Sequence, residues 1–245
     1  MFTQTISRFL RRFSPITPKS DTTLNLHTMD GALLRCQQRG HPVTSVIDVG
    51  ASNGCWSVRA RQYFPKAFFF LIEAQKAHEK SLRILKNSDN TIDFEIVAAG
   101  DTNGELFFDG TDLFGGAASY QAFNNKKTLI VPVKKIDTIV TDHGLKPPFL
   151  LKLDTHGFEI PIFNGAQETL KDTEIIIVEA YNFKLRNEPT CVRFCELCSF
   201  LEEKGFRCID IVDLMNRKYT DMAFWQMDMV FVRGNRSEFE YNQYE

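Results

Sequence analysis

Short apolar runs alternate along the chain with longer stretches in which apolar residues recur at helical spacing. The runs are continuous enough to form strands buried on both faces, as in a parallel sheet. We predict seven strands, at Ser45–Val49, Phe68–Glu73, Asp93–Ala98, Phe149–Leu153, Glu174–Glu179, Arg207–Val212 and Met227–Arg233. Because helical stretches separate most of these runs, the pattern predicts an α/β fold with a doubly wound, mainly parallel sheet that the last two strands close as a hairpin.

The intervals between the strands predict five helices. They are expected at Met29–Gly40, Gly54–Tyr63, Gln75–Lys86, Glu159–Leu170 and Thr190–Lys204. The interval Thr102–Gly144 differs, because it is long, rich in Gly and Asn, and contains the strand-like pieces Gly104–Phe108 and Thr128–Lys134. We interpret it as an insertion between strands three and four that lies over the ligand edge of the sheet.

The length of 245 residues and an apolar content of 43% are typical of one globular domain with its own core. We place this domain at residues 28–235, with an N-terminal arm at 1–27 and a C-terminal tail at 236–245. In the arm, apolar residues recur opposite arginines, a pattern typical either of a surface-binding helix or of a frayed arm; they are Phe2, Ile6, Phe9, Leu10 and Phe13. We favour the frayed arm and expect no firm membrane association.

A net charge of −2 gives the whole protein no field that would attract a phosphate backbone, so we do not expect a nucleic-acid partner. Six cysteines in a chain long enough to build a core favour a reduced, cytoplasmic protein.

The segment Val46–Ser57, VIDVGASNGCWS, has the sharpest local signal. A buried strand ends in Asp48, and Gly50 and Gly54 then turn the chain tightly into a helix, as in a cofactor crevice. The G-x-G-x-x-G spacing of dinucleotide binders is missing, and the carboxylate of Asp48 suits an ammonium better than a pyrophosphate.

Two further acids end the next strands. Glu73 can accept both hydroxyls of a ribose, and Asp101 can accept from the amine of an adenine. Each acid also has a structural interpretation, since Asp48 can cap the turn and Asp101 can form an Asx turn with Asn103. Taken together, the acids and glycines predict an adenosine-like ligand with a cationic tail.

Six segments, read in order, resemble the FkbM family of S-adenosylmethionine (AdoMet)-dependent methyltransferases: VIDVGASNG, LIEA, AAGDTNGELFF, VKKIDTIV, LLKLDTHGFEIPIFNGAQETL and IIIVEA. The resemblance covers roughly Val46–Glu179. It implies a class I methyltransferase fold, AdoMet as methyl donor, and O-methylation of a hydroxyl on a sugar, glycan or natural product.

The resemblance also assigns residues to the cofactor. The methionine end falls to Asp48, Gly50, Asn53 and Gly54, the ribose to Glu73 and the adenine to Asp101; the neighbouring Ala51 and Ala74 complete the predicted cofactor set. The chain departs from the family after strand four. The family often has D-x-E-G or D-x-Q-G there, whereas this chain has Asp154-Thr155-His156-Gly157.

Lys152, Asp154 and His156 lie at the mouth of strand four and are the predicted catalytic residues. His156 can take the proton of an acceptor hydroxyl if Asp154 or Glu159 orients its ring; alternatively, it packs in the turn while Asp154 caps the helix near Glu159. Asp154 and His156 are also half of a cation site, but the sequence offers no third ligand, so we predict no metal. Lys152 can pair with Asp154 or Glu179, or hold an anionic substrate.

Two other functions compete with methyl transfer. The first is a non-catalytic module that binds an adenosyl nucleotide in the same fold. The second is a radical AdoMet enzyme, because Cys191, Cys195 and Cys198 have the spacing of a four-iron cluster. We favour a stripe of core cysteines on the helix Thr190–Lys204. In the insertion, LFGGAASYQAFNN combines two glycines with three aromatic residues and suits either a lid over the acceptor or a solvated loop.

Overall fold

The computed structural model describes residues 26–125 and 127–243. The apolar pattern of the N-terminal arm therefore lies outside the described residues. Within the described part of the chain, no helix is both long enough and apolar enough to cross a bilayer.

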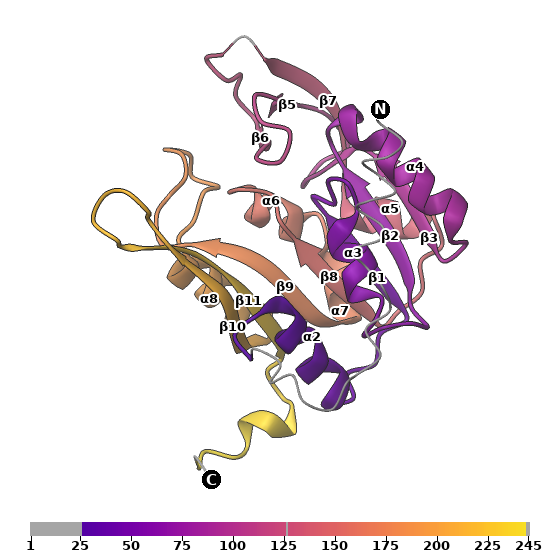
Figure 1. Ribbon diagram of the computed structural model, residues 1–245, viewed down its shortest axis with the longest axis vertical. Helices are drawn as coiled ribbons and strands as arrows, with labels where there is room; N and C mark the ends of the chain where they lie inside the picture. The colour runs from indigo at the N-terminus through magenta and orange to yellow at the C-terminus, as the bar shows by residue number, and fades with distance from the viewer. Residues whose placement is uncertain (1–25, 126, 244–245) are drawn as a thin grey trace.

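The fold is built on a seven-stranded sheet in the order β10-β11-β9-β8-β1-β2-β3 (Figure 1). Six strands run in one direction, and β11, which lies between β9 and β10, runs antiparallel to both. The seven strands are β1 (Ser45–Val49), β2 (Phe68–Glu73), β3 (Ile92–Ile96), β8 (Phe149–Leu153), β9 (Thr173–Tyr181), β10 (Phe206–Asn216) and β11 (Phe224–Arg233). The predicted doubly wound sheet and its closing hairpin are confirmed.

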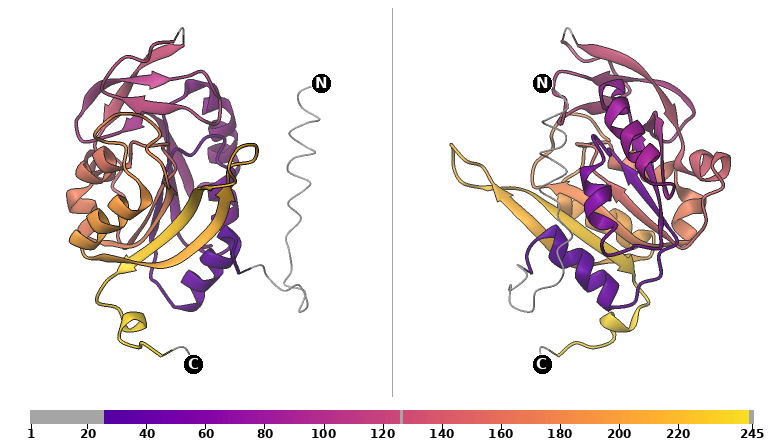
Figure 2. Two further views of the ribbon diagram at one scale, coloured as in Figure 1. Left: turned by 90° about the vertical axis from the view of Figure 1, so that its left-hand side faces the viewer. Right: turned by 45° about the vertical axis from the view of Figure 1, so that its right-hand side comes forward.

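Helices cover both faces of this sheet, as two views show (Figure 2). One face carries α2 (Met29–Gln38), α3 (Cys55–Ala60) and α4 (Glu79–Ser88), and the other carries α5 (Ile136–Asp142), α6 (Glu159–Asn164), α7 (Gln167–Lys171) and α8 (Phe194–Glu203). Side chains alternate between the faces: in β1, Val46 packs on the face that carries α2 to α4, and Ile47 on the face that carries α5 to α8. Every residue of β1 is buried, including the polar Ser45 and Asp48.

The predicted insertion supplies most of a second sheet, and its two strand-like pieces correspond to β5 (Gly104–Asp109) and β7 (Thr128–Lys134). The four strands of this sheet have the order β4-β7-β5-β6, and the other two are β4 (Ala98–Ala99) and β6 (Ala117–Ser119). Leu106 and Val131 of this sheet are buried in the same core as α5 to α8. The second sheet is thereby packed against the C-terminal edge of the main sheet (Figure 1).

Several predicted boundaries were wrong. The strand expected at Asp93–Ala98 divides between β3 and β4, and the helix expected at Glu159–Leu170 divides into α6 and α7 at Gly165. An ideal Cβ on Gly165 would lie 1.9 Å from the carbonyl oxygen of Gly100, so the backbone of the two segments is in direct contact there. The interval read as insertion also contains α5, which the sequence analysis missed.

The predicted cysteine stripe was also wrong. Helix α8 begins only at Phe194, so Cys191 precedes it, and Cys195 is exposed. The buried thiol of Cys191 donates instead to the carbonyl oxygen of Gly157 at 3.2 Å. All six cysteines are free thiols.

Candidate active site

The site lies where the connections of the sheet change direction. From β1 the chain proceeds outward to β2 and β3, and then crosses to β8 on the other side of β1. Such a switch point leaves a crevice at the C-terminal ends of the strands. A cavity of about 310 Å³ opens there, lined by residues that include Gly50, Ser52, Glu73, Ala74, Gln75, Val97, Ala98, Ala99, Phe114, Asp154, Thr155 and His156.

Glu73 ends β2 and is 6% exposed at the cavity wall. One carboxylate oxygen accepts from the amide of Ser52 at 2.6 Å and the other from the amide of Gln75 at 2.7 Å. Burial raises the pKa of this carboxyl, and the two amides act in the opposite direction. Each oxygen keeps a lone pair for a ligand hydroxyl.

Two glycines after β1 are required by the backbone and by packing. Gly50 has φ of +74°, and a Cβ there would lie 2.0 Å from the carbonyl oxygen of Asp154. Gly54 has φ of +82°, and a Cβ there would lie 2.3 Å from a methyl carbon of Leu85. A side chain at Gly50 would therefore force apart β1 and the turn that follows β8.

Asp48 faces the interior of the protein. Its side chain is fully buried, with one oxygen 3.0 Å from the ammonium of Lys152 and the other accepting from the hydroxyl of Ser57 at 2.6 Å. Lys152 is 5% exposed and also lies 3.5 Å from Asp154. Burial lowers the pKa of the Lys152 ammonium, but the charge of Asp48 outweighs this effect and raises it. Neither Asp48 nor Lys152 lines the cavity.

The other predicted cofactor residues divide into two groups. Gly50, Glu73 and Ala74 line the cavity, whereas Ala51, Asn53, Gly54 and Asp101 do not. Asn53 accepts from the amide of Cys55 at 3.2 Å, and Asp101 accepts from the hydroxyl of Tyr120 at 2.6 Å. The apolar lining of the cavity includes Val97, Ala98 and Ala99, together with Phe108, Phe114, Phe158 and Ile162.

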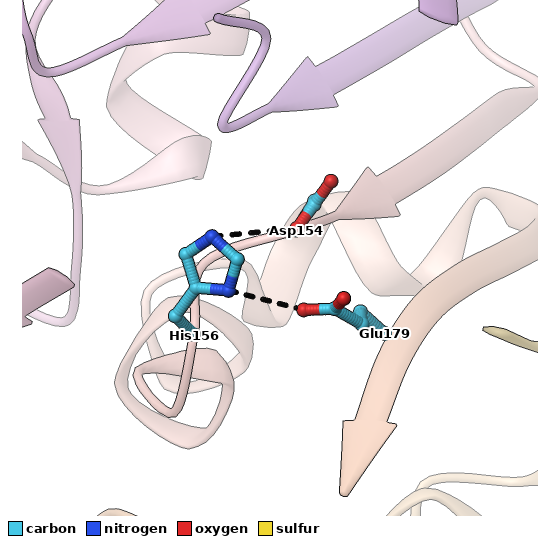
Figure 3. Close-up of side chains that lie close together, drawn as sticks. All are labelled: Asp154, His156 and Glu179. Atoms are coloured by element: carbon cyan, nitrogen blue, oxygen red, sulfur yellow. Dashed lines mark ion pairs between the residues drawn. The ribbon is translucent and has the colours of Figure 1, made fainter. Parts of the chain in front are cut away.

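The turn after β8 places His156 between two carboxylates (Figure 3). Its Nδ1 lies 3.1 Å from Glu179, and its Nε2 lies 3.9 Å from Asp154. The backbone of His156 has φ of +52°, which is uncommon for a residue other than glycine and is consistent with a functional turn.

The hydrogen-bond partners of the His156 ring indicate a protonated imidazole. Nε2 lies 3.3 Å from the carbonyl oxygen of Phe114, and Nδ1 lies 2.8 Å from the hydroxyl of Tyr181, which itself donates to Glu179. Burial lowers the pKa of His156, but the hydrogen bond and charge of Glu179, together with the charge of Asp154, raise it to about 9. An acceptor at each nitrogen requires a proton on both.

Glu179 is the third ionisable residue of the cluster with Asp154 and His156, and it was not among the predicted site residues. Asp154, His156 and Glu179 each bring one potential ligand atom within 4.8 Å of the others, which is a donor set for a divalent cation. Because both ring nitrogens face acceptors, the observed arrangement is that of an imidazolium bridging two carboxylates. The available signal was the position of Glu179 near the end of β9, next to β8 in the sheet.

Arg186 holds the same turn from outside and was also missed. Its guanidinium donates to the carbonyl oxygens of His156 at 2.9 Å and Ala118 at 3.1 Å, and pairs with Glu188 at 3.0 Å. No local pattern marks this residue, because its partners are backbone atoms of distant segments.

Side chains also hold the segment Thr111–Gly116, which we call the cavity loop, above the cavity. The amide of Gln75 donates to the carbonyl oxygens of Asp112 at 3.1 Å and Leu113 at 3.2 Å. His78 Nε2 lies 2.8 Å from the carbonyl oxygen of Leu113. The cavity loop is thus attached to Gln75 and His78 after β2 and to His156 after β8.

A family model described as "Methyltransferase FkbM domain" matches residues 48–208. The chain belongs to the FkbM methyltransferase family. Solved structures of methyltransferases are also similar to this chain, at low sequence identity. A comparison with curated protein sequences finds no match.

One similar structure is the FkbM methyltransferase of Methylobacillus flagellatus KT, with 15% identity and a TM-score of 0.47 over 76% of this chain. This chain spans only 43% of the length of that protein. Another is a putative O-methyltransferase of Klebsiella pneumoniae, with 12% identity and a TM-score of 0.49 over 88% of this chain and 83% of that one.

Proposed function

We propose that the protein is an AdoMet-dependent O-methyltransferase that acts on a hydroxyl of a sugar, a glycan or a small natural product. The observation that carries the proposal is one cavity with a ribose-type carboxylate, Glu73, at one end and the His156–Glu179 pair at the other. An apolar wall beside a buried carboxylate fits an adenosine, because the base needs burial and the ribose needs acceptors.

When bound, AdoMet would supply an electrophilic methyl group for an in-line displacement, so the protein has to align the acceptor oxygen and remove its proton. We assign proton removal to Nε2 of His156, which faces the cavity, in its neutral form. Glu179 is the group that orients the ring in this proposal, since it lies closer than Asp154 and holds Nδ1. Glu159 supports the turn by accepting from the amide of Gly157 at 2.9 Å.

Lys152 is a positioning residue in this proposal. It lies behind the cavity wall and is paired with Asp48 and Asp154, so its charge is not available to an anionic substrate. The net charge of −2 favours a small acceptor over a nucleic acid. The free cysteines favour a cytoplasmic location.

Calorimetric titration with AdoMet tests the cofactor half of the proposal. Glu73→Ala removes a carboxylate that would accept charge-assisted hydrogen bonds, so affinity is expected to fall by about 1 to 3 kcal/mol. Glu203→Ala, an exposed acid at the end of α8, is the matched control and leaves affinity unchanged.

Incubation with labelled AdoMet and a panel of sugars and hydroxylated small molecules tests the transfer half. A protein that binds AdoMet and methylates none of them would support the non-catalytic binding module instead.

A further inference from the structure

Asp154 is the carboxylate that lies at the opposite end of the cavity from Glu73. Because β1 lies between β2 and β8, the residues that end these two strands are separated by two strand spacings, roughly 10 Å. Reading along the sheet edge, the cavity is lined by Val97–Ala99, Glu73, Gly50 and Asp154 in that order. An adenosyl ligand has the same order of groups: base, ribose, sulfur and amino acid.

The carboxylate predicted to take the ammonium of the amino-acid end does not reach this cavity. Both oxygens of Asp48 are engaged, one by Lys152 and one by Ser57, and the side chain is fully buried. Freeing Asp48 for a ligand would leave Lys152 buried beside an uncompensated charge, which is costly.

Asp154 has the features that Asp48 lacks. Its side chain is 41% exposed, and Asp154 lines the cavity together with Gly50, where an added Cβ would lie 2.0 Å from the carbonyl oxygen of Asp154. The cations nearest to this carboxylate are Lys152, 3.5 Å from Oδ2, and His156, 3.9 Å from Oδ1. Both distances exceed the roughly 2.7 to 2.9 Å of a charge-assisted hydrogen bond, so the carboxylate can still pair with a cationic group in the cavity.

Resting on the proposed function, we infer that Asp154 binds the α-ammonium of the methionine part of AdoMet, and that Asp48 serves to hold Lys152, which in turn fixes Asp154. The assignment follows from the observation that Asp154 lines the cavity and Asp48 does not. The two ends of the ligand would then have different partners, with Glu73 at the adenosine part and Asp154 at the amino-acid part.

The test compares two ligands by calorimetry: S-adenosylhomocysteine, which has the amino-acid end, and 5′-methylthioadenosine, which lacks it. Asp154→Asn is expected to weaken binding of S-adenosylhomocysteine about 10- to 100-fold, as for loss of one charge-assisted hydrogen bond, and to leave 5′-methylthioadenosine unaffected. Asp142→Asn, an exposed acid paired with Lys134 outside the cavity, is the matched control and changes neither affinity.

Two further variants keep the outcomes distinct. Glu73→Gln is expected to weaken both ligands alike, and Asp48→Asn to lower the melting temperature without a selective loss of S-adenosylhomocysteine. The inference is overturned if Asp154→Asn weakens both ligands equally or neither, or if Asp48→Asn gives the selective loss. Failure of the parent protein to bind either ligand would overturn the proposed function as well.

Discussion

Two ion pairs, one buried and one partly exposed, determine how single residues contribute to the site. Lys152 and Asp48 form one pair behind the cavity, and His156 and Glu179 form the other at its edge. The sequence analysis identified both cationic residues, because each follows or ends an apolar strand. The contact of Lys152 with Asp154 was among the predicted alternatives. The closer partners, Asp48 for Lys152 and Glu179 for His156, were not predicted, since they belong to strands far apart in the chain whose register only the folded sheet defines.

The first prediction concerns the pH dependence of methyl transfer. Because the pKa of His156 is raised to about 9, its neutral form is populated as pH rises through that value rather than through its ordinary value near 6.5. The single-turnover rate of the parent should therefore rise with pH, reach half of its plateau near pH 9, and level off about one pH unit above that value. His156→Gln should lower the plateau by at least about 10²-fold and abolish the inflection.

His143→Gln is the control for this experiment. His143 contacts Glu95 at 3.0 Å and lies outside the cavity, so its variant should keep the parental profile. A parental rate in His156→Gln would leave His156 as a structural residue of the turn.

The second prediction concerns the pair behind the cavity. Lys152→Met leaves Asp48 buried without its cation and should lower the free energy of unfolding by about 3 to 5 kcal/mol, measured by urea denaturation. Adding Asp48→Asn to that variant should recover part of the loss, because the uncompensated charge is removed. Lys218→Met, at an exposed position, should be close to neutral. Equal stability of the two lysine variants would contradict the importance of the pair.

At the scale of elements, prediction succeeded where burial alone decides the structure. The bounds of β1, β2 and β8 agree with the predicted strands, because each is an apolar run buried on both faces. It failed where a long-range contact intervenes. The break between α6 and α7 at Gly165 depends on Gly100, and the helix α5 was hidden in a segment whose glycines and strand-like pieces suggested an insertion throughout.

The third prediction concerns the cavity loop as an element. Its carbonyl groups are held by Gln75, His78 and His156, which flank both ends of the cavity. A ligand that fills the cavity should therefore increase amide protection across residues 111–125, measured by hydrogen exchange with AdoMet plus acceptor. The hairpin residues 214–222 serve as the internal control and should exchange unchanged. Unaltered protection at 111–125 would rule out a lid.

At the scale of the whole molecule, the second sheet shares its core with the main sheet. Phe108 and Val133 of the second sheet are buried in one cluster with Leu151 and Phe163. The sequence indicated the position of the insertion but could not show this shared core, since the apolar residues of short strands do not reveal what they pack against.

The fourth prediction follows from the shared core. The two sheets should unfold in one cooperative transition, so amides of β5 and β7 should lose protection at the same urea concentration as those of β8. Pulse-labelled hydrogen exchange along a urea series measures this directly. Loss of protection in β5 and β7 at lower urea would show that the second sheet is an independent unit.

The charged groups that line the cavity would bind a sulfonium methyl donor and its thioether product with different affinities. Glu73, Asp154 and His156 line the cavity, and none of the described lining residues is a lysine or arginine. Carboxylates therefore outnumber cations there, and such a field attracts positive charge. A sulfonium carries a positive charge that a thioether lacks. Methyl transfer would thus remove the charge that the cavity attracts, so the spent donor would be held less tightly than the donor that entered.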